Sequence, residues 1–132
     1  MTWKLNHYWV SLDCPSNDSF QFWKQEWLEH GTCSENVLNQ TDYFAAAVRL
    51  KEEVDVLGQL EKGGVRPDGA LYLLNTILNA IPGGGIMCNK NESGDVQLYQ
   101  IYLCADHSAS KIIPCPVLPD SQCISPIVFP SF

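Results

Sequence analysis

The 132-residue chain is short of basic residues. It has 8 lysines and arginines against 15 aspartates and glutamates, which gives a formal net charge of −7. A surface that binds nucleic acid through its phosphates normally gathers lysine and arginine side chains. Here the eight basic residues are scattered along the chain. The sequence therefore offers no extended basic patch, and RNA could bind only in a pocket that is positive locally.

The chain also lacks a long apolar run. None approaches the roughly 20 residues that a membrane-spanning helix needs. Residues 1–5 do not read as a signal peptide. With 45% hydrophobic and 17% charged residues, the composition is that of a globular protein. We expect a single domain over residues 1–132 with no membrane association.

Metal-ligand spacings are absent as well. The six cysteines include no pair separated by two residues, and they form no ligand set with the three histidines. We expect no metal and no cofactor, and a disulfide framework in their place. Three sequons for N-linked glycosylation, at Asn17, Asn39 and Asn91, fit passage through a secretory compartment.

The hydrophobic period changes along the chain from that of helices to that of strands. It predicts helices over residues 1–9, 19–31, 42–51, 56–61 and 70–81, and strands over 86–88, 96–104 and 127–129. Asn91–Gly94 is expected to be a hairpin turn. Gly83–Gly85 lacks the lysine and hydroxyl residue of a phosphate loop, so we expect a connector. Helices first and strands last are typical of the α+β class.

One predicted helix carries most of the chemistry. Ser19 is its candidate N-cap and Gly31 its candidate C-terminal glycine. Between them, Glu26 and His30 are four residues apart, on the same helical face as two tryptophans. Two interpretations fit this spacing: a structural ion pair at the edge of a core helix, or an acid/base site. Spacing alone does not choose between them.

The literal string favours the second. Residues 26–33, Glu-Trp-Leu-Glu-His-Gly-Thr-Cys, resemble the second active-site segment of the ribonuclease T2 family, His-Glu-Trp-x-Lys-His-Gly-Thr-Cys. Residues 8–15 and the strings at 86–89, 97–104, 114–116 and 129–132 are similar to plant members related to self-incompatibility ribonucleases. The resemblance covers essentially the whole chain. It implies an α+β fold with helices packed on an antiparallel sheet, and a monomer.

The resemblance also implies a reaction and its residues. Family members cleave single-stranded RNA through a 2′,3′-cyclic phosphate, with one histidine from each of two segments as general base and general acid. Matched residue by residue, His30 is the catalytic histidine of the second segment and Glu26 its glutamate. Gln25 and Glu29 fall at substrate-binding positions. Glu29 replaces the family lysine, so an anion stands where a cation would face phosphate.

The first active-site segment, His-Gly-Leu-Trp-Pro, does not occur in these 132 residues. His7 and His107 lie in unrelated contexts, where we expect exposed or packing roles. We therefore expect the N-terminal part of the family fold to be missing and the ribonuclease activity to be impaired or lost. The alternative is a non-catalytic relative used in storage, defence or interaction. A secreted or vacuolar location follows from the resemblance.

The cysteines complete the expectations. The resemblance implies disulfides between Cys88 and Cys123 and between Cys104 and Cys115. In family members, the cysteines that match Cys14 and Cys33 bond to partners in the first segment. Here we expect both to be free thiols or to pair with each other.

Overall fold

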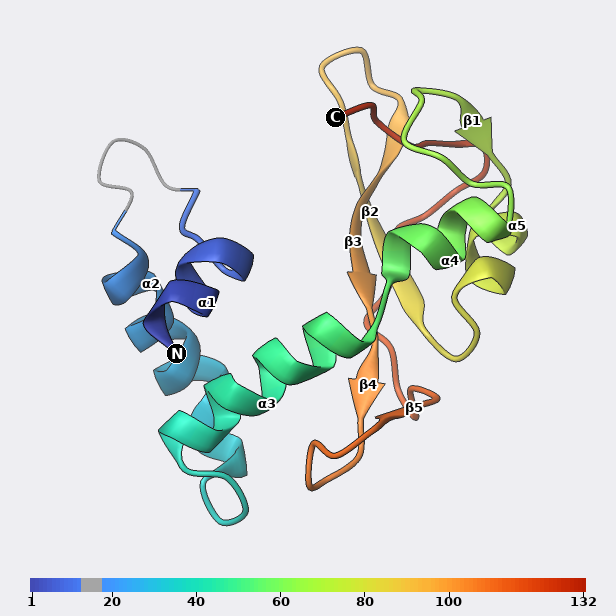
Figure 1. The fold of residues 1–132 in the computed structure, drawn as a ribbon. Helices are drawn as coiled ribbons and strands as arrows, with labels where there is room; N and C mark the ends of the chain where they lie inside the picture. Colours follow the sequence, from blue (N-terminus) through green and yellow to red (C-terminus); the bar gives the residue numbers. More distant parts are fainter. Residues whose placement is uncertain (13–17) are drawn as a thin grey trace. The chain divides into compact units, whose positions relative to one another are not determined.

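The computed structural model describes residues 1–12 and 18–132, which divide into two compact units (Figure 1). Unit 1 comprises Met1–Val54 and His107–Lys111, and unit 2 comprises Asp55–Asp106 and Ile112–Phe132. None of the described helices is long and apolar enough to cross a bilayer. The single domain expected from the composition stays a prediction.

Unit 1 is built from helices. Its elements are α1 (Thr2–Tyr8), α2 (Ser19–Glu26), the π-helical turn η1 (Trp27–Gly31), the 3₁₀ turn η2 (Thr32–Ser34) and α3 (Gln40–Glu53). Its buried core consists of Leu5, Trp23, Phe44 and Val48, surrounded by further aromatic rings. The buried Trp23 indole donates its N–H to the carbonyl oxygen of Trp9 at 2.6 Å. Its polar group is therefore satisfied.

A side-chain cap explains where α2 begins. Asp18 caps α2, because its carboxylate accepts hydrogen bonds from the backbone N–H groups of Phe20 and Gln21 at 3.1 Å each. The expected cap, Ser19, instead accepts a bond from the backbone N–H of Ser11 at 3.2 Å. The sequence prediction was thus wrong by one residue, since aspartate and serine are both strong caps.

Unit 2 combines two helices with two small sheets. Its elements are α4 (Val56–Lys62), β1 (Leu71–Tyr72), α5 (Leu74–Ala80), β2 (Gly85–Lys90), β3 (Val96–Tyr102), β4 (Cys104–Ala105), β5 (Ile112–Ile113) and β6 (Ile127–Val128). The larger sheet has the strand order β1-β6-β3-β2, and the smaller one pairs β4 with β5. The α+β class is confirmed.

Two details of unit 2 differ from expectation. Strand β6 pairs antiparallel with β1 but parallel with β3, so the larger sheet is mixed. A tight hairpin between two strands makes them antiparallel, whereas a long connection also allows parallel pairing. The connection from β3 to β6 is long, so their parallel pairing is possible. The helix predicted over residues 70–81 starts at Leu74, because Leu71–Tyr72 form an edge strand against β6. Tertiary pairing overrides local propensity there.

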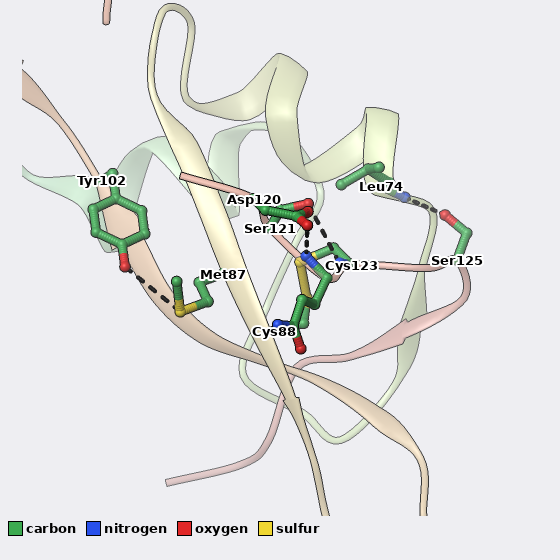
Figure 2. Close-up of a disulfide and its surroundings, with 9 residues drawn as sticks. Leu74, Met87, Cys88, Tyr102, Asp120, Ser121, Cys123 and Ser125 are labelled. Atoms are coloured by element: carbon green, nitrogen blue, oxygen red, sulfur yellow. Dashed lines mark hydrogen bonds between the residues drawn. A yellow bond between two sulfur atoms is a disulfide. The ribbon is translucent and has the colours of Figure 1, made fainter. Parts of the chain in front are cut away.

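The core of unit 2 lies between α4, α5 and the larger sheet. Its fully buried side chains are Leu60, Val65, Ile77, Ile81 and Ile127. The expected Cys88–Cys123 bond is present (Figure 2). Cys88 belongs to this core and Cys123 packs against it. The backbone N–H of Cys88 donates to the carbonyl oxygen of Ser121 at 3.0 Å. The second expected bond, Cys104–Cys115, is also present and joins the ends of the β4–β5 hairpin.

Candidate active-site turn

The segment that resembles the family motif is not a regular helix throughout. Helix α2 ends at Glu26 and continues as the π turn η1 over Trp27–Gly31. The backbone N–H of Thr32 donates to the carbonyl oxygen of Trp27, five residues earlier. Single π turns within helices are rare and are frequent at functional sites. The irregularity therefore marks the same residues as the sequence motif.

The turn requires a glycine at position 31, because a side chain there would overlap the Trp27 ring. Its φ of −79° and ψ of −33° are right-handed helical values, so it is not the left-handed C-terminal glycine that the sequence predicted. It is buried against the Trp27 indole. A Cβ atom on Gly31 would lie 2.8 Å from Cζ3 of that ring and closer still to Cε3. The absence of a side chain lets the indole pack directly on the turn.

The inner residues of the turn lie beside α3, and Glu26 is the last residue of α2 before it. It is half-buried. The Trp27 ring packs edge-on against Tyr43 of α3, with centroids 5.5 Å apart. Burial, and secondly the Glu26 carboxylate, raise the pKa of Tyr43 above its usual value. Tyr43 was not among the predicted site residues; the sequence placed it only within the helix predicted over residues 42–51.

His30 and Glu29 lie on the solvent side. Their side chains are 62% and 56% exposed, and His30 Nε2 is 4.0 Å from Glu29 Oε2. Gln25 donates from Nε2 to the other Glu29 oxygen at 2.8 Å. Among the residues that the structure describes, Glu29 is the carboxylate in ion-pair range of His30. The structure thus brings Gln25, Glu29 and His30 together.

The expected i, i+4 neighbours, Glu26 and His30, do not form an ion pair within residues 1–12 and 18–132. A regular helix places residues four apart on one face. The hydrogen bonds of a π turn span five residues, which changes that spacing. The structure pairs His30 with Glu29 at the solvent-exposed side of the turn instead.

The remaining candidates lie outside η1. His7 is exposed on α1 with its ring against Tyr8, and His107 is exposed in the turn after β4. Cys33 is an exposed free thiol in the structure, which is the first of the two expected states. Cys14 lies outside the described residues, so its state stays a prediction. In the described part of the chain, no group of three or more histidine, cysteine, aspartate or glutamate side chains could hold a metal ion.

The comparisons with known proteins decide the family. The model of the ribonuclease T2 family matches residues 1–115. The chain belongs to the ribonuclease T2 family. It is 47% identical over 133 residues to "Ribonuclease 3" of Arabidopsis thaliana, covering 97% of this chain and 60% of that protein. It is 45% identical over 134 residues to "Extracellular ribonuclease LE" of Solanum lycopersicum, covering 97% and 58%.

Two further relatives bear on function. A "Ribonuclease-like storage protein" of Panax ginseng is 36% identical over 115 residues, covering 82% of this chain and 47% of that one. The crystal structure of RNase NT in complex with 5′-AMP has a TM-score of 0.88 at 38% identity, covering 98% of this chain and 66% of that one. The chain thus spans about half to two thirds of the length of these T2 proteins.

Proposed function

We propose that this chain comes from an RNA-cleaving lineage of the T2 family, that it keeps a folded second active-site segment, and that its activity is impaired or absent. The observation that carries the proposal is the Glu29 carboxylate, 4.0 Å from His30 Nε2 at the exposed turn. The lineage reaction is cleavage of single-stranded RNA through a 2′,3′-cyclic phosphate.

The position of His30 supports a role in proton transfer. A general acid or base must come within hydrogen-bond reach of the substrate oxygen that it protonates or deprotonates. The exposed imidazole on η1 meets that condition, whereas a core histidine would not. Glu26 is half-buried, and its carboxylate contributes to the raised pKa of Tyr43. We assign His30 and Glu26 the catalytic positions on this basis.

Glu29 opposes the same reaction. The phosphorane that forms during cleavage carries extra negative charge, which active sites stabilise with cations and hydrogen-bond donors. A carboxylate beside His30 repels that charge and also competes with the substrate for the protonated imidazole. Gln25 donates its amide N–H to Glu29 at 2.8 Å, so that donor is occupied as well. Substrate phosphate would have to displace both contacts.

The relatives support a nucleotide ligand and a secretory route. RNase NT was crystallised with 5′-AMP, and one relative is named an extracellular ribonuclease. We infer weak binding of single-stranded RNA at the η1 turn and a secreted or vacuolar protein. The two disulfides agree with an oxidising compartment.

A non-catalytic role is the second candidate. The substitution at Glu29 favours it, and so does the similarity to a protein named as a storage protein. In this case the T2 fold would be kept for storage, defence or interaction, with no selection on phosphate binding.

The test is cleavage of single-stranded RNA by this chain beside His30→Ala, with 2′,3′-cyclic phosphate ends scored from pH 4 to 8. We expect equal, background-level cleavage from both proteins. Cleavage by the unaltered chain that His30→Ala abolishes would show a working site and overturn the proposed impairment. Circular dichroism of both proteins controls for folding.

A further inference from the structure

Two N-glycosylation sequons lie within the described residues, and their surroundings differ. One is Asn39-Gln40-Thr41 at the start of α3, and the other is Asn91-Glu92-Ser93 between β2 and β3. The third sequon starts at Asn17, outside the described residues. We infer that Asn39 is a site of N-linked glycosylation and that Asn91 is not.

Asn39 can carry a glycan and still do its structural work. It is exposed, and so are Gln40 and Thr41. Asn39 is the N-cap of α3: its Oδ1 accepts from the backbone N–H of Asp42 at 3.0 Å. Glycosylation replaces one hydrogen on Nδ2 and leaves Oδ1 in place, so the cap survives. The contact put at risk is the exposed bond from Nδ2 to the Asp42 carboxylate, at 2.7 Å.

Both the backbone and the side chain of Asn91 are hydrogen-bonded within a tight turn. Its backbone N–H donates to the carbonyl oxygen of Asp95 at 3.0 Å, and its own carbonyl oxygen accepts from Gly94 at 2.9 Å. Its Oδ1 accepts from the backbone N–H of Asp95 at 2.9 Å, and its Nδ2 donates to the Asp95 carboxylate at 3.1 Å. The residue is half-buried. A sugar on Nδ2 would have to fit beside the Asp95 carboxylate in this half-buried turn, whereas at Asn39 the same position is exposed.

The timing of folding also favours Asn39 over Asn91. The oligosaccharyltransferase, which attaches the glycan, needs an acceptor asparagine that is not yet folded. The β2–β3 hairpin is local, and such hairpins form within about 1–10 μs once the strands are available. Asn91 would therefore be closed into its turn early. Asn39 stands at a helix end, and helix ends fray and reopen. Its amide stays available for longer.

The reaction needs a donor of a defined class, a lipid-pyrophosphate-linked oligosaccharide in the secretory pathway. The Asn39 Nδ2 attacks the anomeric carbon of the first N-acetylglucosamine. The new N–C bond forms as the C–O bond to pyrophosphate breaks, and the lipid pyrophosphate leaves with the electron pair. The amide nitrogen loses one proton to a base of the oligosaccharyltransferase. This inference does not rest on RNA cleavage by the chain.

The experiment is secretion of the full chain from cultured eukaryotic cells behind a cleavable leader. Peptide N-glycosidase in H₂¹⁸O then marks each formerly glycosylated asparagine as an ¹⁸O-labelled aspartate, which peptide mass spectrometry assigns to its position. We expect the label at Asn39 and none at Asn91. Label at Asn91, or none at Asn39, would overturn the inference.

Two matched variants separate the sites at the level of intact mass. Thr41→Val removes the sequon hydroxyl but keeps the Asn39 cap, and Ser93→Ala does the same for the second sequon without altering Asn91. We expect Thr41→Val to lower the mass of the secreted protein by one glycan and Ser93→Ala to leave it unchanged. The reverse pattern would show that the hairpin, not the α3 cap, carries the glycan.

Discussion

Replacing Glu29 by lysine is the most direct way to test the electrostatic argument. Glu29 Oε2 is 4.0 Å from His30 Nε2, and both side chains are more than half exposed. Two unit charges about 4 Å apart interact by about 1 kcal/mol in water and about 4 kcal/mol at an effective dielectric constant of 20. Because this turn is open to solvent, the lower figure applies.

A phosphate bound beside His30 would lie at a similar distance from residue 29. Glu29→Lys turns a repulsion of about 1 kcal/mol into an attraction of the same size, a change of about 2 kcal/mol. That corresponds to roughly 30-fold tighter binding of single-stranded RNA at low salt. Glu29→Gln removes only the repulsion, so we expect about 5-fold.

The assay is fluorescence anisotropy of a labelled RNA oligonucleotide at several salt concentrations. One added phosphate contact should steepen the slope of log K against log salt by about 0.7 for single strands. Glu92→Lys is the matched control, since it makes the same charge change at an exposed turn of unit 2. Equal tightening by Glu29→Lys and Glu92→Lys would refute a local phosphate site and leave only the net charge.

Three further predictions concern stability. Gly31→Ala should lower the free energy of unfolding in urea by about 1–3 kcal/mol, because the new methyl group overlaps the indole; a Trp27→Leu background should reduce that loss. Burial raises the pKa of Tyr43 in the folded protein. The contribution of Tyr43 to stability is therefore present below the unfolded pKa of about 10 and is lost as the pH rises through the folded pKa. Thermal melts at alkaline pH should show this loss of stability, and Tyr43→Phe should reduce the dependence of stability on pH. Removing the Cys88–Cys123 bond, which spans 35 residues, should cost about 1 kcal/mol more than removing the other disulfide, which spans 11, in the same urea assay.

The helices and main strands were predictable from sequence because period and capping are local signals. Helices α1, α3 and α4 and strands β2 and β3 lie close to their expected ranges. Strand β1 was missed because its two residues, Leu71–Tyr72, become a strand only by pairing with β6 near the other end of unit 2. No local pattern in a two-residue segment carries that information.

The candidate site was predictable in its residues but not in its geometry. The motif located Glu26, Glu29 and His30, and the structure keeps Glu29 and His30 together. The sequence predicted a regular helix, in which Glu26 and His30 would be neighbours. In the π turn the Trp27 indole packs over Gly31, and the helical period of the sequence does not distinguish such a turn from a regular helix.

The position of strand β6 determines when the larger sheet of unit 2 can be completed during synthesis. Its two residues, Ile127–Val128, lie between β1 and β3, and Ile127 is fully buried. The larger sheet stays divided until this strand enters, although α4, α5 and the β2–β3 hairpin are all synthesised before it. During translation, α4, α5 and the β2–β3 hairpin are therefore present with an unpaired strand edge and exposed apolar side chains, and such intermediates are prone to aggregate. We therefore expect the chain to need chaperones during synthesis until β6 has been made and has paired with β1 and β3.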